Sequence, residues 1–289
     1  MINDKSLSIF LLLISSIAIS FGGLIMRNIE IANTWQIIFY RSLFFSITIL
    51  IILIFKYKIL IFNNVKNIGK AGLIGAFFYT IANIMFVHAF ANTSVANALF
   101  TLSSIPFITA FLAFYFLNEK LLLRTIIIML MAFLGIIIMI VEGLALGQIY
   151  GNVMALGTAI SFSCFAITLR KFRNLDMVPT LLAAGLLIIF ITFFITFNNF
   201  RIPIKELLLC FLWGGILSGF VNYIFIYATR FLYASSVTFF MLFEFALGPF
   251  WVWVFINEVP AFWTLIGGFI IMSSVMAFIW KEVKTQSLA

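Results

Sequence analysis

Ten apolar stretches of about twenty residues follow one another along the chain, with short polar breaks between them. A bilayer core of about 30 Å is crossed by roughly 20 apolar residues in an α-helix, so each stretch is long enough to span a membrane. Backbone in lipid must satisfy its own hydrogen bonds, which predicts helices rather than strands. The predicted spans cover residues 7–27, 35–55, 70–90, 95–117, 122–141, 150–169, 179–198, 207–228, 233–256 and 260–280.

The same pattern occurs twice, the second copy about 139 residues after the first. Matching residues at that offset include Gly75 and Gly214, Asn83 and Asn222, Phe86 and Phe225, and Asn118-Glu119 and Asn257-Glu258. Each copy holds five predicted spans, and a unit with an odd number of spans ends on the side opposite its start. The second copy should therefore be inverted. The predicted fold class is an all-α polytopic membrane protein with ten transmembrane helices in two inverted five-helix repeats, residues 1–143 and 148–284.

Composition agrees with a membrane protein, because 65% of the residues are hydrophobic and only 9% are charged. A soluble domain of 289 residues could not bury so much apolar surface. No basic segment precedes the first apolar stretch and no cleavage site follows it, so we expect a retained helix rather than a signal peptide.

The net charge of +8 could indicate nucleic-acid binding, but the positions of the basic residues favour contact with an anionic membrane surface. With the N-terminus inside, the predicted cytoplasmic side collects thirteen of the seventeen basic residues. This predicts an inner (plasma) membrane protein with both termini in the cytoplasm and no nucleic-acid partner. The thirteen are Lys5, Lys56, Lys58, Lys66, Lys70, Lys120, Arg124, Arg170, Lys171, Arg173, Arg230, Lys281 and Lys284.

Motifs in three spans occur in an informative order. The fourth span has small residues at 95–99, Pro106 near its middle and a Phe-Leu-Asn-Glu-Lys ending at 116–120. The ninth span has Ala-Ser-Ser at 234–236, Glu244, and Phe-Ile-Asn-Glu at 255–258. The second span has Tyr40-Arg41. Together they resemble the EamA family of the drug/metabolite transporter superfamily. That family usually has glycine where Asn118 stands, and Glu-Pro in the ninth span, whereas here the proline is Pro249. This displaces any kink by about one turn.

The resemblance implies a carrier of small organic metabolites built from two inverted halves. It also implies a central cavity lined by spans 1, 3, 4, 6, 8 and 9.

Glu244 is the sharpest single candidate, because it lies near the predicted bilayer centre, where a carboxyl group is costly. Its repeat mate is Ile105, so the acid breaks the internal symmetry. The functional interpretation is a carboxyl that exchanges a proton or binds a substrate amine. The structural alternative is a glutamate bonded to neighbouring helices, and the sequence leaves both open.

Further polar positions are candidates for solute binding. Helical spacing places them in stripes on spans 3, 8 and 4, with one serine in each of spans 1 and 6. The alternatives are amide bonds between helices and hydroxyls bonded to their own backbone. These candidates are Tyr79, Asn83, Asn222, Tyr223, Tyr227, Asn97, Thr101, Ser20 and Ser161.

Two further residues are candidates for coupling or gating together with Glu244. His88, at the predicted outer end of span 3, is the one histidine and is titratable near neutral pH. Arg41, in the outer part of span 2, could snorkel outward, pair with Glu30 or meet an anionic solute; the first two are favoured.

The sequence thus predicts a secondary transporter of small organic metabolites, such as amino acids or related amphipathic solutes, that works by alternating access. Proton coupling or exchange would drive it, because no Walker A or metal motif is found and no cofactor is expected. The alternatives are a flippase for lipid or lipid-linked substrates and, less favoured, an intramembrane lipid-modifying enzyme. The expected partners are a small-molecule solute and the bilayer, with the chain a monomer or homodimer.

Overall fold

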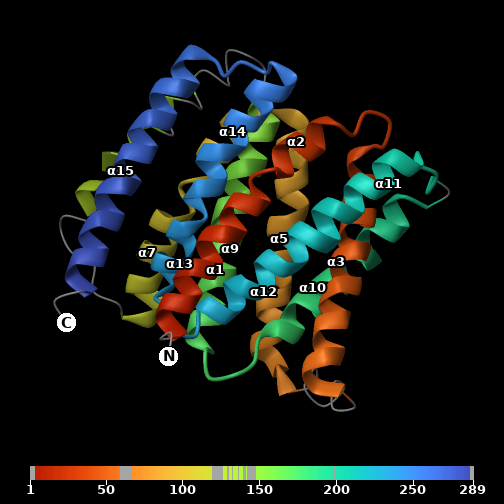
Figure 1. Cartoon of the computed structure of the whole chain (residues 1–289), viewed down its shortest axis with the longest axis horizontal. Helices are drawn as coiled ribbons and strands as arrows, with labels where there is room; N and C mark the ends of the chain where they lie inside the picture. Colours follow the sequence, from red (N-terminus) through yellow and green to blue (C-terminus); the bar gives the residue numbers. More distant parts are fainter. Residues whose placement is uncertain are drawn as a thin grey trace.

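The computed structural model describes residues 4–58, 67–118, 126–128, 130–131, 133–135, 137–138, 141, 148–197 and 199–286. Every regular element within these residues is a helix, and the helices pack side by side in one bundle (Figure 1).

Seven described helical stretches are long and apolar enough to cross a membrane. Some are divided into shorter helices. They are α1 (Asp4–Ile19) with α2 (Gly22–Arg27), α3 (Thr34–Tyr57), α5 (Gly69–Asn92), α6 (Val95–Leu102) with α7 (Ile105–Leu117), α9 (Ile149–Lys171), α10 (Val178–Ile195), and α11 (Ile204–Cys210) with the π-helix η2 (Phe211–Ser218) and α12 (Gly219–Ala228).

The predicted ninth and tenth spans coincide with α13 (Ala234–Phe240) plus α14 (Leu242–Ile256) and with α15 (Phe262–Gln286). The predicted fifth span, 122–141, falls largely outside the described residues. The helices are therefore compatible with ten spans in two inverted halves, and the full repeat stays a prediction.

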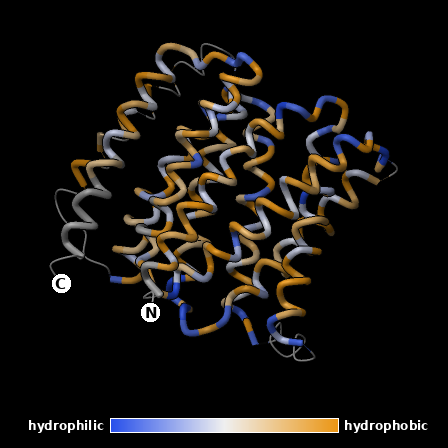
Figure 2. Tube along the Cα trace, in the orientation of Figure 1, coloured by the Kyte–Doolittle hydropathy of each residue, from blue (hydrophilic) through white to orange (hydrophobic). Residues whose placement is uncertain are grey.

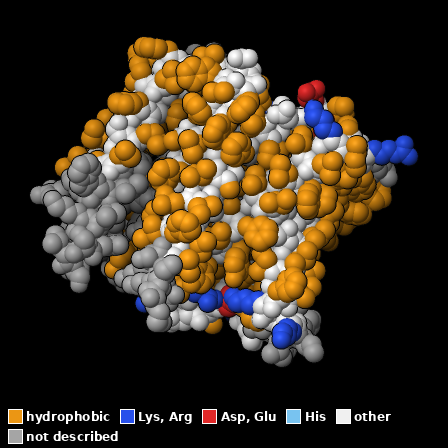
Figure 3. Space-filling view, in the orientation of Figure 1, with side chains coloured by type: hydrophobic (Ala, Val, Ile, Leu, Met, Phe, Trp, Pro, Cys, Tyr) orange, Lys and Arg blue, Asp and Glu red, His pale blue; other side chains and the backbone are white. Residues whose placement is uncertain are grey.

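The surface has the pattern expected of a multi-pass membrane protein. Large apolar side chains such as Phe55, Phe269 and Phe190 are 81%, 74% and 63% exposed along the sides of the bundle. Charged side chains gather at its two ends, with an apolar belt between them (Figures 2 and 3). Such a belt is stable only against lipid, because water would leave its apolar area uncompensated.

Several spans are interrupted near their middles. The fourth breaks between α6 and α7, where the hydroxyl of Ser104 donates to the carbonyl of Thr101 at 2.7 Å. The ninth breaks at Met241, and α14 continues through Pro249. α14 packs closely on α6 beside Pro249, and a kink at that proline stays a prediction. Irregular backbone at membrane depth is tolerated where protein or a cavity surrounds it.

Close backbone approach fixes the second and eighth spans against each other. A Cβ built on Gly214 of η2 would lie 2.1 Å from the carbonyl oxygen of Arg41 in α3. Only glycine allows this approach, which sets the depth and direction from which the Arg41 side chain leaves its helix.

The loop between α2 and α3 is held by a buried carboxylate on α11. Glu206, 3% exposed, accepts hydrogen bonds from the backbone N–H groups of Glu30, Ile31 and Ala32 at 3.1, 2.9 and 2.8 Å. Both carboxylate oxygens are used, so three donors of this loop depend on one side chain.

Replacing Glu206 by glutamine should lower the free energy of unfolding by about 2 kcal/mol, because the amide NH2 would face backbone donors. The measurement is the thermal unfolding midpoint of the purified protein in detergent. Glu30→Gln is the matched control, since the Glu30 side chain is exposed and only its backbone N–H takes part. Equal midpoints for the two variants would contradict this role of Glu206.

Candidate functional site

A cavity lies among the interrupted helices in the interior of the bundle. It leaves about 90 Å³ of room for the centres of water molecules, enough for several of them. All six spans that the family resemblance implies contribute to it, and α3 adds Arg41. The lining residues are Leu12, Ser15, Ser16, Ile19, Arg41, Tyr79, Ala82, Asn83, Phe86, Leu102, Ile105, Thr158, Phe162, Ser218, Val221, Asn222, Phe225, Met241, Glu244 and Phe245.

Much of this lining comes from positions that are equivalent in the two halves. Spans 3 and 8 contribute pairs 139 residues apart, and so do spans 4 and 9. The cavity therefore lies where the two copies of the pattern meet, as expected for a carrier built from repeats. The pairs are Tyr79 and Ser218, Ala82 and Val221, Asn83 and Asn222, Phe86 and Phe225, Leu102 and Met241, and Ile105 and Glu244.

Arg41 is buried in the bundle, 5% exposed. Its Nη1 donates to Oδ1 of Asn83 at 2.9 Å and its Nη2 to Oγ of Ser218 at 3.2 Å. The guanidinium also lies over the ring of Trp213, 4.4 Å from the centroid, a favourable cation–π distance. The expectation that Arg41 snorkels outward or pairs with Glu30 is wrong, because partners inside the bundle supply the hydrogen bonds that water would supply at the surface.

Glu244 also lines the cavity and is 5% exposed. It lies in the first turn of α14, directly after the break at Met241, where the helix dipole favours a negative charge. Within the described part of the chain it forms no hydrogen bond or ion pair, although its charge interacts with that of Arg41. The site thus holds a guanidinium group and a carboxyl group that share a cavity without contacting each other.

Of the other candidates, Tyr79, Asn83 and Asn222 line the cavity. Asn222 donates through Nδ2 to the carbonyl of Ser218 at 2.8 Å, so both asparagines belong to the surroundings of Ser218 and Arg41. Tyr79 packs against Phe45, with ring centroids 5.7 Å apart. These three residues come together as the helical stripes indicated.

The remaining solute-binding candidates do not line this cavity. The Ser20 hydroxyl donates to the carbonyl of Ile17 and accepts from Nε1 of Trp251 at 2.9 Å. Thr101 donates to the carbonyl of Asn97, the backbone bond that the sequence left as an alternative. Asn97 belongs to a separate polar cluster described below. Ser161, Tyr223 and Tyr227 are partly buried outside the lining.

His88 lies away from the cavity, near the end of α5. Its ring packs edge-on against Trp35 at 4.7 Å, and Nδ1 lies 3.4 Å from the hydroxyl of Tyr150. These contacts join α5 to α3 and α9, so any gating role would act through helix packing rather than through a solute.

Sequence reasoning missed several polar lining residues. Ser15 and Ser16 on α1 and Thr158 on α9 face the cavity, and Trp213 lies behind Arg41. The adjacent serines within an apolar span were the signal that could have found the first two. Among the described residues, no group of three or more His, Cys, Asp or Glu side chains is placed to hold a metal ion.

Comparison with known proteins agrees with this architecture. The model of the EamA-like transporter family matches residues 6–141, which confirms the resemblance seen in the motifs. A solved structure titled "Crystal structure of protein" superposes with a TM-score of 0.70 at 13% sequence identity, covering 94% of this chain and 96% of that one. At that identity the likeness concerns the fold alone. No curated protein matches the sequence.

Proposed function

We propose that this chain, which residues 6–141 place in the EamA-like transporter family, carries small zwitterionic metabolites with apolar side chains, such as neutral amino acids, across the plasma membrane. One observation supports this most directly. Arg41 and Glu244, both buried, line the same cavity without forming an ion pair. A solute that carries a carboxylate and an ammonium group would complement both charges at once.

The Arg41 guanidinium suits the carboxylate end of such a solute. Asn83 and Ser218 use one donor on each terminal nitrogen, and Nε has no hydrogen-bond partner among the described residues. A guanidinium has five N–H donors in a planar fork that matches a carboxylate, so donor capacity remains. Trp213 covers one face of the group, which leaves its edge for the solute.

The opposite side of the cavity suits the ammonium end and the side chain. The Glu244 carboxylate is an acceptor for an ammonium group, and Asn222 can supply its amide oxygen. Most of the other lining residues are aliphatic or aromatic, which favours solutes with apolar side chains.

Transport would proceed by alternating access between the two halves. The central cavity lies between equivalent positions of the repeats, where a rocking motion exposes it to each side in turn. α1 begins and α15 ends at the same end of the bundle (Figure 1). The ion pairs of Asp176 with Lys56 and Arg230 lie among the basic residues assigned to the cytoplasm. Solute exchange or a proton gradient is the energy source in this proposal.

The test is counterflow of labelled L-leucine and L-phenylalanine in proteoliposomes of the purified protein. Two leucine analogues serve as matched competitors, 4-methylpentanoate, which lacks the amine, and 3-methylbutylamine, which lacks the carboxylate. Each analogue should compete roughly thirtyfold more weakly than leucine, because one buried charge of the site stays unpaired. Equal competition by either analogue, or no exchange of any labelled amino acid, would contradict the proposal; the second result would favour a lipid substrate.

A further inference from the structure

A second pocket lies at the end of the bundle where α2 and α14 terminate, opposite the N-terminus of α1 (Figure 1). It leaves about 460 Å³ for the centres of water molecules, much more than the central cavity. With the cytoplasmic termini proposed above, this pocket faces the outside. Its lining is mainly polar: Arg27, Ala91, Asn92, Thr93, Ser94, Asn97, Gln148, Glu258, Val259, Ala261 and Thr264.

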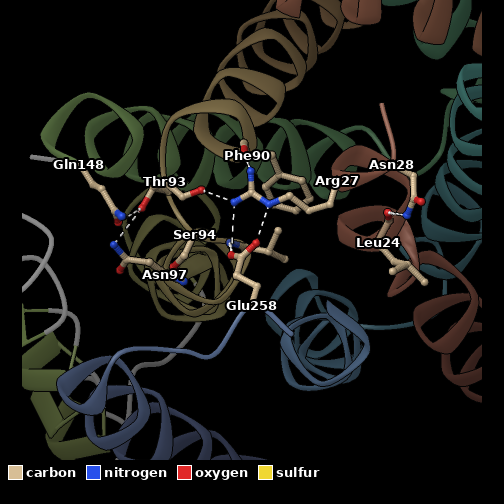
Figure 4. Close-up of polar contacts among 10 residues, drawn as sticks. Leu24, Arg27, Asn28, Phe90, Thr93, Ser94, Asn97, Gln148 and Glu258 are labelled. Carbon is tan, nitrogen blue, oxygen red and sulfur yellow. Dashed lines mark hydrogen bonds and ion pairs between the residues drawn. The ribbon is translucent and has the colours of Figure 1, made fainter. Parts of the chain in front are cut away.

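An ion pair on its wall joins three segments. Arg27 at the end of α2 donates from Nε to Oε2 of Glu258 at 2.7 Å, and from Nη2 to the Thr93 carbonyl at 2.9 Å (Figure 4). Glu258 in turn accepts from the backbone N–H of Val95 at 2.9 Å. The two charged side chains are 26% and 24% exposed, so a solute from the aqueous phase can reach them.

Asn97 supplies a polar group that its surroundings do not satisfy. The residue is 2% exposed, and its Nδ2 donates to Oδ1 of Asn152 at 2.7 Å and to Oγ1 of Thr93 at 3.1 Å. Among the described residues, Oδ1 of Asn97 and Nδ2 of Asn152 have no hydrogen-bond partner. Exchanging oxygen and nitrogen in both amides again leaves one acceptor and one donor unmatched. Buried polar groups are normally paired, so this cluster has hydrogen-bonding capacity left for a further partner.

The pocket therefore repeats the chemistry of the central site, with Arg27, Glu258 and Asn97 in place of Arg41, Glu244 and an asparagine. We infer that it is a second binding site for the same zwitterionic solutes, an assignment that rests on the proposed function. The solute carboxylate binds Arg27, and its ammonium group binds Glu258 and Oδ1 of Asn97. The solute replaces the Arg27–Glu258 ion pair with two ion pairs, one to Arg27 and one to Glu258. Binding therefore weakens the contact between α2 and α14.

A chain of contacting aromatic rings links the two sites. Phe90 packs on Phe86 with centroids 4.4 Å apart and stacks on Trp213 at 6.2 Å, and Arg41 lies on that same tryptophan. Arg27 donates from Nη1 to the carbonyl of Phe90 at 3.3 Å. A solute that draws Arg27 away thus releases a contact of Phe90, which packs on Phe86 in the lining of the central cavity.

The experiment counts labelled L-leucine bound at saturation to the full chain in phosphatidylglycerol nanodiscs, which contain no zwitterionic lipid. Wild type should bind about two molecules per chain, Asn97→Leu about one, and Arg41→Gln about one. Asn28→Leu is the matched control, because Asn28 lies at the same end, its side chain donates to the Leu24 carbonyl, and it lines neither pocket. It should bind as wild type does. Arg27→Gln, which leaves the amide cluster intact, should also bind about one molecule per chain. This second variant separates loss of the outer site from misfolding of the Asn97→Leu protein.

The possible results separate this inference from the proposed function. A wild-type stoichiometry of one that Arg41→Gln abolishes and Asn97→Leu leaves unchanged would overturn the outer site and keep the transport proposal. No binding by wild type would overturn both. If phosphatidylethanolamine bound competitively at Asn97 while leucine bound only at Arg41, the pocket would belong to a lipid headgroup, and the solute assignment would fall.

Discussion

Arg41→Gln should weaken L-leucine binding at the central site by about a hundredfold, or roughly 3 kcal/mol. The glutamine removes the buried cation that faces the cavity and leaves the solute carboxylate without a charged partner. The measurement is the concentration of leucine that half-saturates counterflow. Arg201→Gln is the matched control, because Arg201 is exposed at the end of the bundle and should leave transport unchanged.

Competition by 3-methylbutylamine distinguishes loss of the carboxylate partner from simple loss of structure in this variant. In Arg41→Gln, 3-methylbutylamine should compete as well as it does in wild type, because this analogue has no carboxylate to lose a partner. If leucine bound Arg41→Gln with wild-type affinity, or if both ligands were lost together, Arg41 would be a structural residue that holds Asn83 and Ser218 in place.

Glu244→Gln should abolish accumulation of leucine driven by a proton gradient, while exchange at saturating leucine persists. The glutamine keeps the size of the side chain and its acceptor oxygen but can neither carry a proton nor balance an ammonium group. The measurement is uptake into proteoliposomes with and without an imposed pH gradient, and Glu30→Gln, at an exposed position, is the control.

A second measurement tests whether Glu244 binds the ammonium group of the solute. In Glu244→Gln, the amine-free analogue 4-methylpentanoate should compete nearly as well as leucine, since the site has lost its preference for a cation. Accumulation that still follows the gradient in the variant would show that Glu244 does not couple transport. Unchanged discrimination against 4-methylpentanoate would show that it does not bind the amine.

The spans and their order could be predicted because hydropathy reports a local property. A helix in lipid needs a long apolar run whatever its neighbours are. The described helices coincide with the predicted stretches from 7–27 to 260–280, apart from the fifth, which falls largely outside the described residues. The helix break at Met241 was not predicted, because no proline or glycine lies next to it in the sequence.

The candidate site could be predicted only in part. Glu244 stood out because a carboxyl is costly at mid-membrane depth, and the Asn83–Asn222 pair stood out through the repeat. For Arg41, snorkelling outward or pairing with Glu30 was favoured over meeting a solute, since its depth in the helix did not reveal that Asn83 and Ser218 face it. Asn97 was grouped with a solute stripe, whereas it belongs to a cluster at the end of the bundle.

By itself, the sequence determined the membrane class of the protein, the order of its helices, the internal duplication and the family resemblance. Tertiary structure decided which polar side chains meet: Arg41 with Glu244 around one cavity, and Arg27 with Glu258 across 231 positions of the chain. The physical reason is that lipid and a packed membrane-protein interior are equally apolar. Hydropathy therefore cannot tell which face of a helix points to lipid and which to the cavity, and only the packing of the helices makes that distinction.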